Sequence, residues 1–393
     1  MGRADLRTLA SFDPGGRRVL VRTDFNVPLS DGEIGDDRRI VATLPTLRRL
    51  LDDGAALVLA SHLGRPDGRP DPALSLRPVG QRLQEALDGR VTLAPDSVGH
   101  TTEHAAAALA PGEILLLENT RFHSEEERND QGYAAALAEL ADYFVNDAFG
   151  TLHRAHASTV GVAAHLPSAA GLLVEKELAA LDRAARQPAR PYVVLIGGAK
   201  IDSKLPALRK LLARADRILV GGGVANTLLA ASGHALADSL LEDDCIGAAE
   251  KLLETAGERL VLPVDIVIAD GAGEDATLKV VPVGDLENGW RIVDIGPQTV
   301  ALFEHEIAAA ATTAWSGPLG RFEIARFSKG TFAIARALAD AEGYTIVGGG
   351  ETASAVRAAE AEAGIDHIST GGGASLAYLC GDSLPGLEVL RKP

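Results

Sequence analysis

Glycine-rich turns between strand-like and helix-like segments are the feature that most constrains the fold of this chain. They occur at four places in the second half of the sequence: VVLIGGAKIDSKL from Val193, ILVGGGVANTLL from Ile218, TIVGGGETASAV from Thr345 and HISTGGGASLAYL from His367. Glycine lets the backbone approach a ligand closely, and a helix that begins there presents free N–H groups to an anion. Ordinary strand-to-helix turns also use glycine. Four such turns in one half of the chain favour a sheet that binds a nucleotide.

Strand-like runs alternate with alanine-rich helical runs along almost the whole chain. The strand-like runs are RRVLVRTD, AALVLAS, EILLLE, YFVNDA, YVVLIGG, RILVGGG, VDIVIAD and YTIVGGG. This pattern predicts an α/β fold of parallel sheets with helices on both faces, in which ligands bind beyond the carboxyl ends of the strands. GAGEDA from Gly271 fits a dinucleotide-binding pattern, but the strand-like TLKVVPV that follows it contradicts this interpretation.

The length of the chain and a proline-containing break near residue 187 predict two domains. The chain has 393 residues, and a helical stretch from Leu172 to Arg186 is followed by QPARP and a new strand at Tyr192. We expect an N-terminal domain over residues 1–170, a connecting helix over 171–186 and a second domain over 187–368.

Composition argues against several classes of protein. The formal net charge of −16 is unfavourable for a general binder of nucleic acids or acidic membranes. The sequence has no apolar run of about twenty residues, and its start, MGRADLRTLASFD, lacks the apolar stretch of a signal peptide. We therefore expect a cytoplasmic protein, and nothing in the sequence demands more than a monomer. Cys245 and Cys380 match no metal-site spacing and are expected to be buried.

Basic side chains follow the strand-like runs of the first half. They lie in RTDFNVPL, SHLGRPDG, LLLENTRFHSEEE and VNDAFGTLHRAHAS, and DDRRI adds Arg39. Arginine binds phosphate and carboxylate oxygens in two-point geometry, so this gathering in an acidic protein predicts a pocket for a small phosphorylated acid. A surface ion pair is the alternative for any single arginine. His153 and His156 are a conceivable metal pair, but no carboxylate or cysteine stands at a matching spacing.

The second half contains no Walker motif. Lys200 and Lys204 are four residues apart, and we expect them on one face of a helix that opens after Gly198. Glu323 is a candidate to bind ribose hydroxyls. Glu351 begins a helix, where an acidic side chain is favourable through the dipole alone or, with phosphates bound nearby, can reach a magnesium ion.

These segments together resemble the phosphoglycerate kinase family across nearly the whole chain. RTDFNVPL, SHLGRPDG, LENTRFHSEEE, DAFGTLHRAHAS, GGAKIDSK, WSGPLGRFE, GGGETA and HISTGGGASL occur in the order of that family. The resemblance implies two Rossmann-like domains separated by a cleft and a hinge, with the acid substrate on the first and the nucleotide on the second. It also implies that the final segment, about 369–393, packs back on the first domain.

The resemblance implies sites at matching positions. The 3-phosphoglycerate site falls on Asp24, Phe25, Asn26, Arg39, His62, Leu63, Gly64, Arg65, Arg121 and Arg154. The nucleotide site falls on Gly198, Ala199, Lys204, Gly222, Pro318, Glu323, Gly349, Gly350, Glu351 and Thr352. Arg39 and Lys200 take the places of the groups at the transferring phosphoryl group. Glu351 takes the place of the ligand to Mg²⁺, which accompanies ATP or ADP.

The chain departs from the family pattern at three positions. Glu351 replaces the aspartate of GGGDT, Ser316 replaces the asparagine of WNGP, and Ile292 replaces the glycine of a WMGLD segment. The first change bears on magnesium geometry, and the other two weaken individual nucleotide contacts. None of them touches the arginines of the acid site.

The implied reaction is reversible transfer of phosphoryl between 1,3-bisphosphoglycerate and ADP, giving 3-phosphoglycerate and ATP in glycolysis. In the reverse direction the acceptor is a carboxylate, which is already ionised at neutral pH, so no general base is required. Positioning and charge neutralisation remain, and closure of the two domains would exclude water. Two alternatives stay open here: a kinase for another carboxylate such as acetate, and a two-domain binding protein for a phosphorylated solute. Testing acetate against 3-phosphoglycerate with ATP decides on the first, and binding of both ligands without formation of an acyl phosphate would favour the second.

Overall fold

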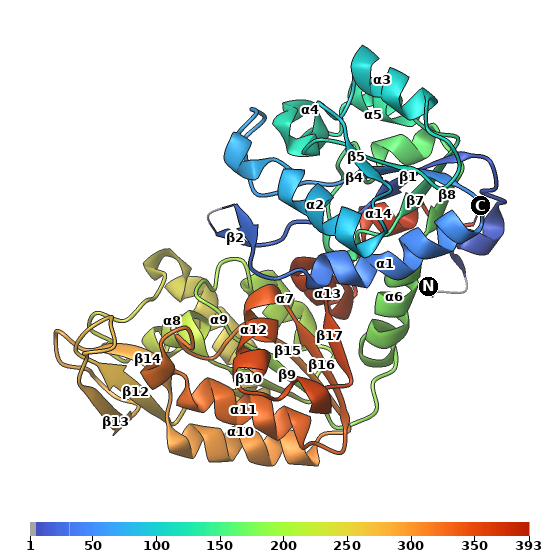
Figure 1. Ribbon diagram of the computed structural model, residues 1–393. Helices are drawn as coiled ribbons and strands as arrows, with labels where there is room; N and C mark the ends of the chain where they lie inside the picture. The colour runs from blue at the N-terminus through green and yellow to red at the C-terminus, as the bar shows by residue number, and fades with distance from the viewer. Residues whose placement is uncertain (1–4, 31, 393) are drawn as a thin grey trace. The chain divides into compact units, whose positions relative to one another are not determined.

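The computed structural model describes residues 5–30 and 32–392, and the chain forms two compact units (Figure 1). Unit 1 comprises residues 1–179 and 383–393, and unit 2 comprises residues 180–382. Over the described residues, none of the helices combines the length and the apolar character that a membrane span requires.

The sheet of unit 1 has six parallel strands in the order β5-β6-β4-β1-β7-β8. Its strands are β1 (Arg18–Arg22), β4 (Ala56–Ala60), β5 (Val91–Leu93), β6 (Ile114–Leu116), β7 (Tyr143–Asn146) and β8 (Ser168–Ala170). Val19, Leu20 and Val21 of β1 are all fully buried, so both faces of this central strand are covered. An uninterrupted apolar run is typical of such a strand, and the predicted parallel sheet is confirmed.

Helices cover the sheet of unit 1. They are α1 (Arg38–Asp52), α2 (Arg77–Ala86), α3 (His100–Ala107), α4 (Ser124–Glu127), α5 (Gln131–Ala138), α14 (Pro385–Glu388) and the first part of α6 (Leu172–Ala185), which continues into unit 2. Helix α1 shows why they pack there, because Ile40, Leu44, Leu47 and Leu51 recur at three- and four-residue spacing and are buried on one face. This face joins the core formed by the strands of the sheet.

Unit 2 is built on a second six-stranded parallel sheet, in the order β11-β10-β9-β15-β16-β17. Its strands are β9 (Tyr192–Ile196), β10 (Arg217–Val220), β11 (Leu260–Val261), β15 (Thr312–Ser316), β16 (Tyr344–Gly348) and β17 (His367–Ser369). Its helices are α7 (Leu205–Leu211), α8 (Gly222–Ala231), α9 (Ile246–Ala256), α10 (Pro297–Ala309), α11 (Lys329–Ala339), α12 (Gly350–Ala358) and α13 (Gly372–Leu379). Trp315 of β15 and Phe303 of α10 are buried in its core.

A small antiparallel sheet adds to unit 2. Strand β12 (Asp265–Ala269) lies between β13 (Leu278–Pro282) and β14 (Arg291–Ile295) and runs antiparallel to both. The expectation that VDIVIAD belongs to the parallel alternation was therefore wrong. The segment from β12 to β13 is too short for a parallel crossover, which needs a dozen or more residues, so the chain returns as a hairpin. GAGEDA is part of that hairpin loop, which confirms that it opens no dinucleotide-binding helix.

Three of the four glycine-rich turns lead directly into helices. Helices α8, α12 and α13 begin at Gly222, Gly350 and Gly372. The fourth does not, because α7 begins only at Leu205. The expectation that Lys200 and Lys204 share a helical face was wrong for this reason. A helix opening after Gly198 would hold Pro206 in its interior, where the proline ring clashes with the carbonyl four residues earlier.

The chain passes between the two units twice. The first passage falls within α6, between residues 179 and 180, and the second falls between residues 382 and 383. Residues 367–382, with β17 and α13, belong to unit 2, so the return to unit 1 begins later than residue 369. The returning segment pairs with the start of the chain, since Arg7 N donates to Leu390 O at 2.9 Å and Lys392 N donates to Asp5 O at 2.8 Å. Figure 1 shows α14 among the blue and green elements of unit 1.

Candidate functional site

The predicted acid site lies at one edge of the sheet of unit 1. Its motifs follow β1, β4, β6 and β7, and these four strands are neighbours in the order β6-β4-β1-β7. All four run in the same direction, so their carboxyl ends meet at one edge. The topology therefore brings together segments that are up to 130 residues apart in the sequence, from Asp24 to Arg154 (154 − 24 = 130).

A chain of hydrogen bonds links the predicted residues. The Arg39 Nη1 atom donates to Asp24 Oδ1 at 3.0 Å and to the carbonyl of Asn26 at 3.1 Å. The Asn26 Oδ1 atom accepts from Gly64 N at 2.9 Å, and the Gly64 carbonyl accepts from Arg121 Nη1 at 2.9 Å. These contacts fix the positions of two guanidinium groups before any ligand binds, which lowers the entropy cost of binding.

His62 lies among several guanidinium groups. Burial lowers the pKa of His62 well below its ordinary range, and the charges of Arg22, Arg121, Arg39 and Arg154 lower it further. The Arg22 Nη2 atom is 3.3 Å from His62 Nδ1. Because a guanidinium can only donate, Nδ1 accepts and the proton of the neutral ring is on Nε2. His62 therefore presents an N–H donor.

Arg22 lies next to His62 and Glu126 lies next to Arg22, and the sequence reasoning named neither as a site residue. Their side chains are almost fully buried, with Arg22 Nη2 3.9 Å from Glu126 Oε1. Glu126 also accepts from Ser158 N at 2.9 Å and Ser158 Oγ at 2.5 Å, and Arg22 Nε donates to Ser158 Oγ at 2.6 Å. Burial lowers the pKa of His156 to about 3, and the charge of Arg121 lowers it further, so His156 is neutral. The only sequence signal for Arg22 was its position directly after the apolar run of Val19, Leu20 and Val21, and Glu126 gave no signal.

Other predicted residues of the acid site contribute differently. Phe25 and Leu63 are buried in the hydrophobic core, so their side chains are not available to a ligand. The backbone N–H of Leu63 already donates to Asn119 Oδ1 at 3.2 Å. Arg65 is exposed to solvent. The half-buried Arg154 donates through Nε to His153 Nε2 at 3.3 Å, and its charge acts on His62 as described above.

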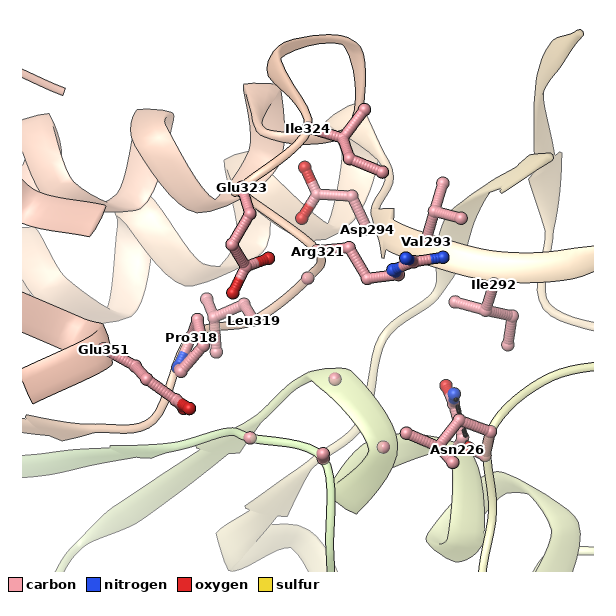
Figure 2. Close-up of a pocket in the computed structure, with 16 residues that line it drawn as sticks. Asn226, Ile292, Val293, Asp294, Pro318, Leu319, Arg321, Glu323, Ile324 and Glu351 are labelled. Atoms are coloured by element: carbon pink, nitrogen blue, oxygen red, sulfur yellow. Dashed lines mark hydrogen bonds between the residues drawn. The ribbon is translucent and has the colours of Figure 1, made fainter. Parts of the chain in front are cut away.

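Unit 2 contains a cavity of about 440 Å³ at the carboxyl ends of its parallel strands (Figure 2). Six of the predicted nucleotide residues line it: Gly198, Ala199, Gly222, Pro318, Glu323 and Glu351. The sequence reasoning missed part of the lining: Asn226, Leu240, Val293, Asp294, Leu319 and Arg321. The volume is within the usual range for small-molecule sites.

The cavity has polar and apolar parts. The apolar side chains of Leu240, Ile292 and Leu319 line one part of it. The carboxylates of Glu323 and Glu351 also line it, and Figure 2 shows both side chains extended away from the backbone. Of the three departures from the family pattern, Ile292 and Glu351 line the cavity. Ser316, at the buried end of β15, is not among the lining residues.

Glycines around the cavity serve two purposes. A Cβ atom on Gly223 would lie 2.0 Å from the carbonyl oxygen of Ala199, and one on Gly197 would lie 2.1 Å from that of Pro318. At these positions glycine is required because backbone packs against backbone. By contrast, a Cβ atom on Gly350 would meet no atom within 4 Å, so open space lies beside the start of α12.

The remaining predicted residues of unit 2 lie around this cavity but do not line it. Burial lowers the pKa of Lys204, and the charge of Glu351 opposes that shift, which places the two side chains near each other. Thr352 Oγ1 accepts from Gly317 N at 2.7 Å and thereby ties α12 to the turn after β15. Gly349 adopts φ 104°, a conformation that favours glycine. Lys200 is exposed in the loop before α7.

No preformed metal cage appears in the described residues, since no three His, Cys, Asp or Glu side chains are placed to hold one ion. His153 and His156 therefore lack a third protein ligand of these types. The single carboxylate of Glu351 matches a different mode, in which magnesium keeps several waters and binds one or two carboxylates together with substrate phosphates.

Comparisons with known proteins agree over nearly the full length. The family model described as phosphoglycerate kinase matches residues 9–382. A phosphoglycerate kinase of Desulforudis audaxviator is 51% identical over 98% of this chain and 99% of its own length, and one of Roseiflexus castenholzii gives the same figures. The phosphoglycerate kinase structure from Coxiella burnetii has a TM-score of 0.84 at 38% identity, and that from Pyrococcus horikoshii has 0.88 at 32%; each alignment covers 98% of both chains. This chain belongs to the phosphoglycerate kinase family.

Proposed function

We propose that the basic edge of unit 1 binds 3-phosphoglycerate and that the cavity of unit 2 binds ATP or ADP. Family membership supplies the reaction, which is reversible phosphoryl transfer between 1,3-bisphosphoglycerate and ADP to give 3-phosphoglycerate and ATP. The observation that supports the acid site most strongly is the set of four arginine charges acting on one neutral, buried histidine. Three of these arginines also have a carboxylate partner, but four guanidinium groups close to one histidine still favour a ligand with several anionic oxygens.

In the proposed acid complex, Arg39, Arg65, Arg121 and Arg154 bind the phosphate and carboxylate oxygens, and the Nε2–H group of His62 donates to one of them. Asp24 and Asn26 bind the hydroxyl of the substrate and hold Arg39 in place through the contacts described above. Gly64 contributes its backbone, and Phe25 and Leu63 contribute only the shape of the turns that carry the polar residues.

In the proposed nucleotide complex, the base lies against the apolar lining near Gly198, Ala199, Gly222 and Pro318. Glu323 accepts hydrogen bonds from ribose hydroxyls. Lys204 and the N–H groups of Gly349, Gly350, Glu351 and Thr352 at the start of α12 stabilise the phosphates. Glu351 would hold the magnesium ion of Mg-ATP, which supplies charge neutralisation at the phosphates.

The chemistry follows from these groups. The acceptor carboxylate needs no deprotonation, so the protein has to align the two substrates and neutralise the charge of the transferring phosphoryl group. We assign that neutralisation to Arg39 from unit 1 and Lys200 from unit 2. Because the two half-sites are on different units, transfer requires a hinge movement that brings the ligands together and excludes water. We also propose that the protein acts as a monomer in the cytoplasm.

Neighbouring arginines on α1 provide a test. Arg39→Ala should lower kcat for 1,3-bisphosphoglycerate formation about 100-fold or more, the scale of one lost transition-state donor, with ATP affinity unchanged. Arg38 instead forms an ion pair with Asp36 at 2.8 Å, so Arg38→Ala should stay within a few-fold of the unsubstituted enzyme. The assay couples ATP and 3-phosphoglycerate to a dehydrogenase, with acetate as the alternative acceptor. Full turnover in Arg39→Ala would remove Arg39 from the mechanism.

A further inference from the structure

Two exposed histidines on α3 take no part in the phosphoryl transfer proposed above. His100 and His104 are four residues apart, so they lie on one face of the helix in successive turns. Their rings meet edge to face with centroids 4.3 Å apart, and their Nε2 atoms are 3.2 Å apart. Figure 1 shows α3 at the periphery of unit 1.

The separation of the two Nε2 atoms matches two ligands of one metal ion. At a metal–nitrogen distance of about 2.0–2.1 Å, two nitrogen ligands are about 2.9 Å apart at a 90° angle and about 3.4 Å apart at the tetrahedral angle. The observed 3.2 Å lies between these limits. A hydrogen bond between two neutral imidazoles gives a similar distance, but it requires one ring to donate and the other to accept.

The ligand type decides which ions suit this pair. Imidazole nitrogen favours Zn²⁺, Cu²⁺ and Ni²⁺, whereas Mg²⁺ and Ca²⁺ favour oxygen ligands. Over the described residues no third His, Cys, Asp or Glu joins the pair as a possible ligand. Water would therefore fill the other coordination positions, and the ion would exchange readily with solvent.

The surroundings have two opposing effects. His100 is the first residue of α3, where the positive end of the helix dipole is modestly unfavourable for a bound cation. A metal binds only the neutral imidazole ring. The net charge of −16 attracts cations to the protein as a whole.

We propose that His100 and His104 form a bidentate, water-completed site for a divalent transition-metal ion of the Ni²⁺, Cu²⁺ or Zn²⁺ class. This site is separate from the magnesium ion expected with the nucleotide, because its donors are nitrogen atoms and lie on a different unit from Glu351.

Equilibrium dialysis of the untagged full chain against Ni²⁺ tests the proposal. His104→Ala and His100→Ala should each weaken binding of one ion at neutral pH at least about tenfold, because losing even a hydrogen-bond partner of a metal ligand typically costs about that much. His165→Ala removes a single exposed imidazole from the same unit and should leave that binding unchanged. Thr101→His/His104→Ala retains two exposed histidines on α3 at the wrong spacing and should behave like His104→Ala.

If Thr101→His/His104→Ala bound Ni²⁺ as tightly as the unsubstituted chain, the proposal would be overturned, because the spacing of the two histidines would then not matter. Equal losses in His165→Ala and His104→Ala would also overturn it. Turnover in the coupled assay should be unchanged in all four variants, since none touches the phosphoryl-transfer site. A parallel dialysis at acidic pH should release the ion from the unsubstituted chain, because protonated imidazole cannot bind a metal. Retention there would contradict histidine ligation.

Discussion

Replacing Glu126 by glutamine should destabilise unit 1 far more than the same change at Glu127. Glu126 is fully buried, 3.9 Å from Arg22, and accepts two hydrogen bonds from Ser158. Glutamine has the same shape but leaves the guanidinium of Arg22 without its nearest negative charge. Removing one partner of a buried ion pair costs about 3–5 kcal/mol.

The geometry indicates the lower end of that range. Arg22 and Glu126 are too far apart for a direct hydrogen bond, and the negative charge of Asp24 also acts on Arg22. We therefore expect a loss of about 3 kcal/mol, which corresponds to roughly a 100-fold increase in the population of the opened unit. Glu127 is 3.1 Å from Arg121 Nε, but its side chain is 47% exposed. Glu127→Gln should cost at most about 1 kcal/mol.

Hydrogen exchange measured by mass spectrometry provides the assay, because it reports the free energy of opening for each segment. Amides of β1 and β7 in unit 1 should exchange about 100-fold faster in Glu126→Gln. Both tryptophans, Trp290 and Trp315, belong to unit 2, so their fluorescence gives a separate measure of that unit during urea unfolding. Equal effects of the two substitutions on β1, or a change of less than threefold in Glu126→Gln, would refute the role assigned to the buried carboxylate.

Three further predictions concern unit 2. Burial raises the pKa of Asp294 from 3.8 to about 7, so the folded chain binds a proton at this residue more tightly than the unfolded chain does. The contribution of Asp294 to the free energy of unfolding therefore falls as pH rises from about 4 to about 7. The unfolding free energy of the unsubstituted chain relative to Asp294→Asn should therefore decline over that range; a flat difference would contradict the shift. Gly223→Ala should cost about 1–3 kcal/mol through its clash with Ala199, whereas Gly247→Ala, in open space on α9, should stabilise by a few tenths to about 1 kcal/mol in urea melts. Glu351→Ala should raise the magnesium concentration needed for half-maximal turnover, and an unchanged titration would assign Glu351 to the helix dipole alone.

The gathering of the arginines of the acid site at one edge of the sheet of unit 1 could be predicted because parallel strands impose a simple rule. Once β1, β4, β6 and β7 were identified as strands, their carboxyl ends had to meet at one edge. His62, Arg39, Arg121 and Arg154 follow from that rule together with the family pattern. The neutral state of His62 could not be predicted, because its pKa depends on burial and on distances to several charges at once.

The burial of Glu126 could not be predicted from the charge pattern. It stands in the acidic run SEEE, where the side chains of Glu125 and Glu127 are 41% and 47% exposed and that of Glu126 is fully buried. Three identical residues in a row carry no signal for which one faces inward. The first residue of α7 was also mispredicted. Pro206, rather than the glycines before it, determines where this helix begins.

The pairing of residues 383–392 with the start of the chain has a consequence for synthesis in the cell. The chain is synthesised from its N-terminus, yet Arg7 and Asp5 find their backbone partners in Leu390 and Lys392, which are made only after the whole of unit 2. The residues of unit 2 are contiguous, whereas unit 1 needs segments from both sides of unit 2. Unit 1, although its synthesis begins first, therefore obtains its full set of residues only after unit 2 has been made.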